Sequence, residues 1–323
     1  MIENTIVLEK EELSASLPRN YFFICFASFE ERSTIAALSL NINQVAGSVT
    51  FKSRNSDNDY ALDLICKKLI NTTIIELNLN NPVNIAQGLT ECVKSLIARE
   101  TIPLVIDITT FTHEILAMFL KLLFDNNRKF PNVFLLYNGA QDYSDSISKG
   151  RKQMWLSKGC RDVRNIIGYS GKLSPAAKTS LIVLTGFELE RATGMIEILE
   201  PDKLILGVGI DPINDNNKIT MEHFREEFLK WKLNYKNSSC FEFEFSCKDI
   251  NNTITMIEDL ILSNPNDNYI IVPLNTKLST VATALVALRN PKIQLCYAIP
   301  ELYNVESYSK PSNHMTLLNL SMT

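Results

Sequence analysis

The sequence lacks any hydrophobic run long enough to cross a membrane. Its longest apolar stretches, such as residues 21–27, have the length of a β-strand, whereas a transmembrane helix needs roughly 20 apolar residues. The N-terminal segment carries acids at Glu3, Glu9, Glu11 and Glu12, where a secretion signal has a basic and then an apolar region. We therefore expect a cytoplasmic protein that makes no contact with membranes.

Motifs of metal sites and of common enzymes are also missing. The seven cysteines form no CxxC pair, and the three histidines, His113, His223 and His314, are far apart in the sequence. P-loop, GxSxG, HExxH and protein-kinase signatures are missing as well. Gly207-Val208-Gly209 lacks the third glycine of a dinucleotide fingerprint. We predict no metal ion and no cofactor, and familiar ATPase and hydrolase chemistry is disfavoured.

The composition is that of an ordinary globular chain. Of 323 residues, 46% are hydrophobic and 21% are charged, which excludes a collagen-like, coiled-coil or wholly disordered protein. The net charge of -4 argues against binding nucleic acid through bulk charge, although a local basic stretch is compatible with this total. The length fits one large α/β domain or two of ordinary size.

Apolar, β-rich runs alternate with helical patterns in both halves of the chain. Alternating strands and helices give parallel sheets with helices on both faces. We therefore predict an α/β protein made of two tandem Rossmann-like, doubly wound parallel sheets. The predicted strands are residues 21–27, 48–52, 73–79, 102–108 and 133–137 in the first half, and 180–184, 203–208, 241–246, 269–274 and 293–298 in the second.

Similar residues recur in the same order in the two halves. Strand one runs into Phe29-Glu30-Glu31-Arg32 in the first half and into Phe187-Glu188-Leu189-Glu190-Arg191 in the second. Hydroxyl-bearing residues follow strand four twice, and tyrosines follow strand five twice. We infer an internal duplication with a pseudo-twofold axis. The predicted boundaries are a first domain at 1–148, a basic linker or hairpin at 149–178, and a second domain at 179–323.

The loops at the carboxyl ends of the strands carry the candidate ligand-binding residues, because ligands of open parallel sheets bind at this edge. Glu30 and Arg32, and likewise Glu188 and Arg191, begin the helix after strand one. Each glutamate can cap its helix, since an acid complements the positive helix N-terminus. Each arginine opposes that dipole, so it either pairs with its glutamate or binds an anion such as phosphate.

Polar side chains after strand four form a second candidate cluster. Thr109, Thr110 and Thr112 lie there in the first half, and Asn275 and Thr276 lie there in the second. One threonine in each loop is explained as a helix N-cap. The surplus side chains, beside unpaired backbone N–H groups, predict a phosphate or ribose site.

Asp107 is the candidate for chemistry at this edge. It ends strand four of the first half, where it can act as a general base, a metal ligand or an acceptor for nearby N–H groups. Its counterpart is Pro273, so catalysis shared by both halves is disfavoured. If the chain is an enzyme, its catalytic groups are Asp107, Glu30 and His113, with Arg32 holding the anion.

The joint between the halves concentrates positive charge. Residues 149–178 contain eight lysines and arginines and a single acid, Asp162. The stretch is either a solvated linker or an arm that binds nucleic acid, a nucleotide or an acidic partner. Trp155 and Tyr169 within it can stack on bases. The basic residues with this candidate role include Arg151, Lys152, Lys158, Arg161 and Arg164.

The duplicated arrangement is similar in broad architecture to the paired CARF-type sensor domains of bacterial antiviral defence systems. The resemblance implies a module that binds an anionic, nucleotide-like ligand between two carboxyl-end rims and regulates a separate effector protein. One alternative is an enzyme acting on a nucleotide or a phosphorylated sugar through Asp107, Glu30 and Arg32. A second alternative is a scaffold whose rims bind a protein partner.

Overall fold

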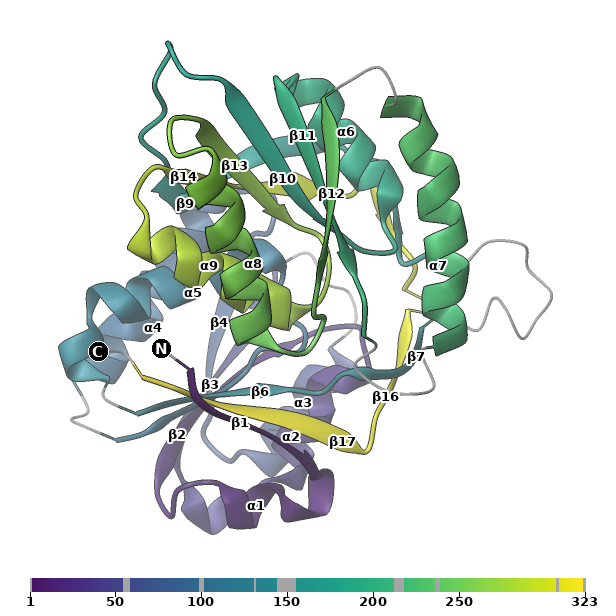
Figure 1. Cartoon of the computed structure of the whole chain (residues 1–323). Helices are drawn as coiled ribbons and strands as arrows, with labels where there is room; N and C mark the ends of the chain where they lie inside the picture. Colours follow the sequence, from purple (N-terminus) through teal and green to yellow (C-terminus); the bar gives the residue numbers. More distant parts are fainter. Residues whose placement is uncertain are drawn as a thin grey trace. The chain divides into compact units, whose positions relative to one another are not determined.

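The computed structural model describes residues 2–54, 59–98, 102–130, 132–143, 155–211, 218–235, 239–305 and 308–321. The chain divides into two compact units (Figure 1). Unit 1 comprises residues 1–142 and 309–323, and unit 2 comprises residues 143–308. Each unit has its own large sheet and its own hydrophobic core.

Unit 1 is built on a seven-stranded sheet with the order β1-β17-β6-β5-β2-β3-β4. Five of its strands are parallel, β17 is added antiparallel to β6, and β1 is added antiparallel to β17. The central strand β2 is buried along its whole length, as expected for a strand covered on both faces. The bounds are β1 Ile2–Glu9, β2 Tyr21–Ala27, β3 Val45–Ser53, β4 Thr73–Leu77, β5 Leu104–Asp107, β6 Val133–Tyr137 and β17 His314–Leu320.

Helices cover both faces of this sheet. On one face α2 packs against α3, over a core that includes Phe23 and Cys25 of β2. Side chains alternate along a strand, so Phe26 points to the opposite face, where its ring meets Phe111 next to α5. The helices are α1 Leu13–Ser16, α2 Arg32–Ser39, α3 Tyr60–Lys68, α4 Pro82–Ile97 and α5 His113–Asp125.

Unit 2 is built on a six-stranded sheet with the order β12-β11-β10-β13-β14-β9. Five strands are parallel, and β9 is antiparallel to β14. One core cluster joins the sheet to α6 and α7, and α8 packs against α9. The bounds are β9 Asp162–Ser170, β10 Thr179–Thr185, β11 Lys203–Gly209, β12 Cys240–Phe245, β13 Asn268–Pro273, β14 Ile293–Ile299, α6 Leu189–Leu199, α7 Lys218–Trp231, α8 Ile250–Ser263 and α9 Lys277–Arg289.

The two sheets repeat one topology. When the parallel strands of each unit are numbered along the chain, both sheets have the order 3-2-1-4-5, which is the strand order of the Rossmann fold. Each sheet also gains an antiparallel strand beside strand five, namely β17 in unit 1 and β9 in unit 2. The prediction of two Rossmann-like α/β units with a repeated strand order is confirmed.

The added antiparallel strands are exchanged between the repeats. β9 follows β6 in the sequence but pairs with β14, and β17 follows β14 but pairs with β6. Short strands lie along both connecting segments: β7 (Ala140–Tyr143) pairs with β16 (Ser309–Pro311), and β8 (Ser157–Lys158) pairs with β15 (Leu302–Tyr303). Each repeat therefore supplies the antiparallel strand that completes the sheet of the other repeat.

This exchange changes the boundaries expected from the sequence. The C-terminal residues 309–323 belong to unit 1 and not to the second unit, because β17 completes the first sheet. The basic stretch 149–178 includes β8 and β9, so its described part is not only a linker: Lys158 is in β8 and Arg164 is in β9. Arg161 immediately precedes β9, and its N–H donates to the Ile299 carbonyl at 2.8 Å. Arg151 and Lys152 lie outside the described residues.

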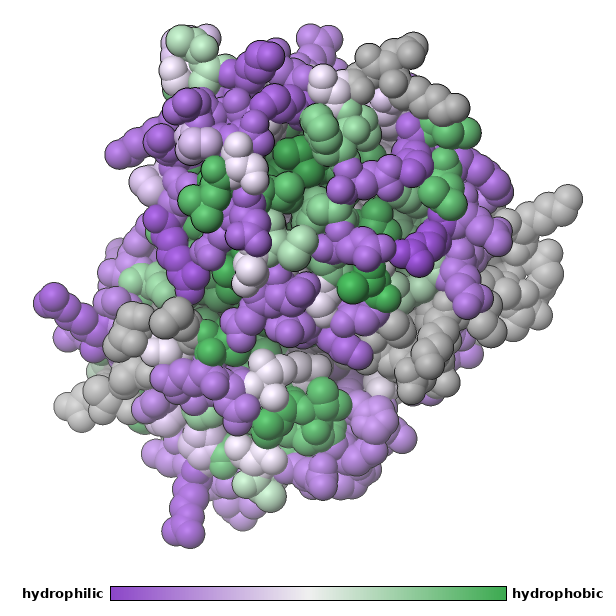
Figure 2. Space-filling view, viewed as in Figure 1, coloured by the Kyte–Doolittle hydropathy of each residue, from purple (hydrophilic) through white to green (hydrophobic). Residues whose placement is uncertain are grey.

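The surface of the described residues is mixed. On the face shown in Figure 2, small groups of hydrophobic residues lie among hydrophilic ones, as is usual for folded proteins. Within the described ranges, no helix combines the length and the apolar character that a membrane crossing requires.

Candidate functional site

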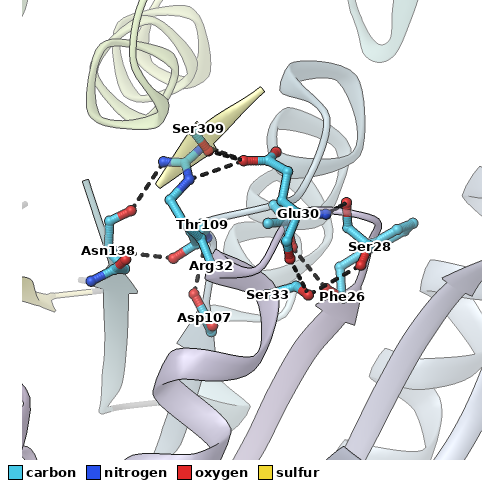
Figure 3. Close-up of polar contacts among 10 residues, drawn as sticks. Phe26, Ser28, Glu30, Arg32, Ser33, Asp107, Thr109, Asn138 and Ser309 are labelled. Carbon is cyan, nitrogen blue, oxygen red and sulfur yellow. Dashed lines mark hydrogen bonds and ion pairs between the residues drawn. The ribbon is translucent and has the colours of Figure 1, made fainter. Parts of the chain in front are cut away.

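A buried ion pair occupies the turn between β2 and α2 in unit 1 (Figure 3). Arg32 donates to Glu30 Oε2 from Nε at 2.9 Å and from Nη2 at 2.5 Å. Arg32 is only 5% exposed, and its Nη1 donates at 3.1 Å to the backbone carbonyl of Asn138, just beyond β6. The Ser309 hydroxyl of β16 donates to the same Glu30 oxygen at 2.9 Å. The pair thus links the start of α2 to the end of β6 through hydrogen bonds.

Asn138 extends this network to the end of β5. Its backbone N–H donates to Thr109 Oγ1 at 2.9 Å, and the Thr109 N–H donates to Asp107 Oδ1 at 3.0 Å. The candidate residues Glu30, Arg32, Thr109 and Asp107 therefore belong to one hydrogen-bonded chain (Figure 3). The sequence indicated all four but missed Asn138, which joins them.

Asp107 lies at the buried end of this network and is 3% exposed. Burial raises its pKa to about 6, while hydrogen bonds from Thr109 and the positive charge of Arg32 oppose part of this rise. His113, the first residue of α5, is 6% exposed. The side chains proposed for catalysis are thus enclosed by the unit itself.

We predict that Asp107→Asn stabilises unit 1 at neutral pH. The pKa of Asp107 is higher in the folded than in the unfolded chain, where it is near 3.8. Its contribution to stability is therefore complete below about pH 4 and is lost as the pH rises through 6. The variant should gain up to about 3 kcal/mol at pH 7.5, and this gain should disappear near pH 4. Calorimetric melting at both pH values measures this difference; equal destabilisation at both would contradict it.

Unit 2 contains a matching ion pair. Arg191 Nη1 donates to Glu188 Oε2 at 2.5 Å, and Arg191 Nε and Nη2 donate to the Ala298 carbonyl of β14 at 3.0 and 2.5 Å. The Ser157 hydroxyl of β8 donates to the other Glu188 oxygen. Arg191 is 2% and Glu188 is 8% exposed, and the Tyr297 ring centroid lies 5.3 Å from the guanidinium carbon.

The two ion pairs occupy equivalent places in the repeated topology. Each arginine links the start of the first helix to a carbonyl at the end of strand five. Each glutamate also accepts from a serine on an exchanged segment, Ser309 in unit 1 and Ser157 in unit 2. Arg32 follows its glutamate by two residues and Arg191 by three, and both arginine side chains still reach the carboxylate. Of the two roles expected for these arginines, the structure shows the pairing with glutamate.

The polar loop after strand four also repeats its contacts. Thr110 Oγ1 donates to the Phe26 carbonyl near the end of β2 at 2.7 Å. Asn275 Nδ2 donates to the Thr185 carbonyl at the end of β10 at 2.6 Å. In both units, therefore, this loop is fastened to the end of the first parallel strand.

The expected N-caps are confirmed. Thr112 Oγ1 accepts from the Ile115 N–H at the start of α5 at 3.1 Å, and Thr276 Oγ1 accepts from the Ser279 N–H at the start of α9 at 3.2 Å. Because these polar groups already bond within their own units, contact with a ligand stays a prediction for them.

A pocket of about 150 Å³ lies at the first turn of α6 in unit 2. Trp155, Phe187 and Phe224 are its aromatic lining residues, and Glu188 of the ion pair also lines it. Lys158 Nζ lies 4.8 Å from the Trp155 ring centroid. The pocket therefore lies at the carboxyl-end rim, where sheets of this kind bind ligands.

Sequence reasoning missed most of this pocket. Phe187 and Glu188 come from the repeated motif after strand one, and Trp155 was singled out only as a base-stacking residue of the basic stretch. His223 and Phe224 come from α7, which no motif connects to the rim. Only the tertiary fold shows that these segments meet.

The residues in the described ranges form no cluster of three or more His, Cys, Asp or Glu side chains that could hold a metal ion. Asp107, one of the residues considered as a metal ligand, instead accepts a hydrogen bond from the Thr109 backbone.

Comparisons with known proteins give distant similarities of fold only. No protein-family model matches the chain, and no curated protein matches it. Among solved structures, it is similar to UDP-GlcNAc 2-epimerase from Neisseria meningitidis bound to UDP-GlcNAc, with 9% identity, a TM-score of 0.23, and 78% of this chain and 77% of that chain covered. It is also similar to leucoanthocyanidin reductase from Vitis vinifera in complex with NADPH, with 9% identity, a TM-score of 0.25, and 84% and 88% covered. Similarity this low assigns neither a family nor a function.

Proposed function

We propose that this chain is a binding module for a nucleotide-like ligand, with its site at the carboxyl-end rims of the Rossmann-like units. The observation that carries the proposal is the aromatic pocket of unit 2, which adjoins the first turn after strand one. This turn is where the fold generally holds nucleotides. Concave sites with aromatic walls and a few polar groups are the usual form of small-molecule sites.

Burial of the candidate catalytic groups favours binding over catalysis. A general base must come within hydrogen-bond reach of the proton that it removes. Asp107 is 3% exposed and His113 is 6% exposed, and Glu30 already accepts from Arg32 and Ser309. An enzyme acting on a nucleotide or phosphorylated sugar would have to open this network before each turnover.

The exchanged segments support a regulatory role. Ser157 and Ser309, which bond to the glutamates of the two rims, lie on the segments that lead to the exchanged strands β9 and β17. A ligand that displaces Glu188 would therefore perturb the segment that leads to β9, the edge strand of its sheet. One that displaces Glu30 would perturb the segment that leads to β17, which lies between β1 and β6. We propose that the module works in the cytoplasm as a sensor of the CARF-like kind in antiviral defence and passes ligand occupancy to a separate effector protein. The basic residues Lys158, Arg161 and Arg164 are a second candidate contact, for nucleic acid.

Isothermal titration calorimetry of the full chain tests the proposed function. The panel comprises nucleoside monophosphates and cyclic mono- and dinucleotides, with ribose 5-phosphate and inorganic phosphate as controls. We expect saturable binding of at least one nucleotide, at least tenfold tighter than either control, and no conversion of it on prolonged incubation as measured by chromatography. Conversion would favour the enzyme, and no binding by any nucleotide would favour the protein scaffold.

A further inference from the structure

The pocket of unit 2 has the walls of a site for a flat ring. Phe187 and Phe224 meet edge to face with ring centroids 5.6 Å apart, and Phe224 is only 7% exposed. Trp155 is anchored on its backbone, since its carbonyl accepts from Asn304 Nδ2 at 3.0 Å. The contact between their rings holds Phe187 and Phe224 in place, and stacking of a base on an aromatic ring contributes about 1–3 kcal/mol.

Acidic residues outnumber basic ones in the lining of this pocket. The lining includes Glu188, Glu190 and Glu227, and its basic residues are Lys158, beside Trp155, and His223. Glu188 is engaged by Arg191 and Ser157. A pocket of this composition repels a phosphate group and favours a ligand that donates hydrogen bonds.

Glu190 and Glu227 retain capacity to accept from a ligand. Glu190 Oε2 accepts from the Gly159 N–H at 2.7 Å, and Glu227 Oε1 accepts from Lys230 Nζ at 2.9 Å. A carboxylate has two oxygens and about four lone-pair sites, so one contact leaves most of this capacity. The hydrogen bond from Lys230 lowers the pKa of Glu227, which keeps this group an acceptor at neutral pH.

We infer that this pocket holds the base of the ligand and selects nucleobases that carry an exocyclic amino group. The base stacks on Trp155 beside the Phe187–Phe224 pair, and its amino group donates to Glu190 or Glu227. The sugar and phosphate stay outside, where Lys158 can contact them. This inference rests on the proposed function, because it assigns the base of a nucleotide-like ligand to one place on the rim.

Tryptophan fluorescence gives a direct readout of this pocket. The chain has two tryptophans. Trp155 lines the pocket, whereas Trp231 is not among the lining residues. The Trp231 indole N–H donates to Thr193 Oγ1 at 2.9 Å. In the full-length Trp231→Phe variant, excited at a wavelength that tyrosine does not absorb, all tryptophan emission comes from Trp155. Guanosine, adenosine and cytidine are the amino-bearing probes, and inosine and uridine lack the amino group.

Each amino-bearing nucleoside is compared with the probe that lacks the amino group: adenosine and guanosine with inosine, and cytidine with uridine. We expect the best amino-bearing nucleoside to quench Trp155 emission and to bind at least tenfold tighter than its counterpart. The double variant Glu190→Gln/Glu227→Gln should lose this preference, because an amide presents one acceptor oxygen where the carboxylate presents two. Glu222→Gln, a change to an exposed acid of α7 outside the lining, is the matched control and should keep it.

The outcomes separate this inference from the proposed function. Equal binding of amino-bearing and amino-free nucleosides overturns the base selection. Calorimetric binding of nucleotides with no change in Trp155 emission also overturns it, but leaves the proposed function standing. If neither nucleosides nor nucleotides bind and spermidine quenches Trp155 instead, the pocket is a site for organic cations, and both proposals fail.

Discussion

Replacing Arg191 by methionine is expected to lower the free energy of unfolding of unit 2 by about 3–5 kcal/mol, the usual cost of removing one partner of a buried ion pair. The change leaves the Glu188 carboxylate, 8% exposed, with only the Ser157 hydroxyl among its described partners. It also removes the two hydrogen bonds that Arg191 donates to the Ala298 carbonyl. Urea unfolding followed by tryptophan emission measures this loss, since Trp155 and Trp231 both lie in unit 2.

Two further variants give the Arg191 experiment its controls. Arg225→Met removes the arginine of the exposed pair with Glu244, whose side chains are 56% and 63% exposed, and should cost under about 1 kcal/mol. The double variant Glu188→Gln/Arg191→Met should recover part of the loss, because no charge is then left buried. A loss in Arg191→Met no larger than in Arg225→Met would show that the buried pair does not hold the rim together.

Replacing Phe111 by alanine is expected to destabilise unit 1 by about 3–5 kcal/mol, the range for removing a buried aromatic ring. Phe111 is fully buried, and its ring lies between 6.0 and 6.1 Å from those of Phe26, Phe51 and Phe119. The cavity would open under the loop that carries Thr110. Hydrogen exchange of amides in residues 104–120, together with calorimetry, should show both the lower stability and faster local opening.

Val83→Ala is the matched control for the Phe111 experiment. Val83 is 56% exposed on α4 of the same unit, and exposed positions of this kind usually change stability by no more than about 0.5 kcal/mol. Exchange in residues 104–120 should be unchanged in this variant. If Phe111→Ala leaves exchange in this segment unchanged as well, the ring cluster does not position the loop.

Much of the fold could be predicted from local patterns. The predicted strands 21–27 and 133–137 match β2 and β6 to the residue, and the other predicted strands end within a few residues of those observed. Continuous apolar runs are a strong signal because strands covered on both faces leave few positions for polar side chains. The same signal in both halves predicted five parallel strands in each, but not their order within the sheets.

The exchanged strands could not be predicted, because their partners are distant in the sequence. β9 carries Asp162 and Arg164 and has several exposed residues, as is typical of an edge strand. That polar pattern, with Gly168 inside the strand and Gly171 just after it, resembled a linker. β17 is largely buried and pairs with β6, more than 170 positions earlier in the numbering, and nothing local distinguishes this partner from β14.

The candidate site was predicted in part, for a similar reason. The repeated motif marked Glu30, Arg32, Glu188 and Arg191, all of which lie at the rims in buried pairs. Whether an arginine binds an anion or pairs with its own neighbouring glutamate depends on which carbonyl groups and serine hydroxyls surround the pair in the fold. Those partners come from other strands, so the sequence motif alone left both alternatives open.

Hydrogen–deuterium exchange of the full chain, with and without the tightest-binding nucleotide of the calorimetric panel, tests the central claim most directly. The claim predicts slower exchange in residues 155–160, 186–191 and 221–227, which surround the carboxyl-end pocket of unit 2. Protection confined to the opposite, amino-terminal ends of the strands, such as residues 199–203 and 264–268 before β11 and β13, would contradict a rim site.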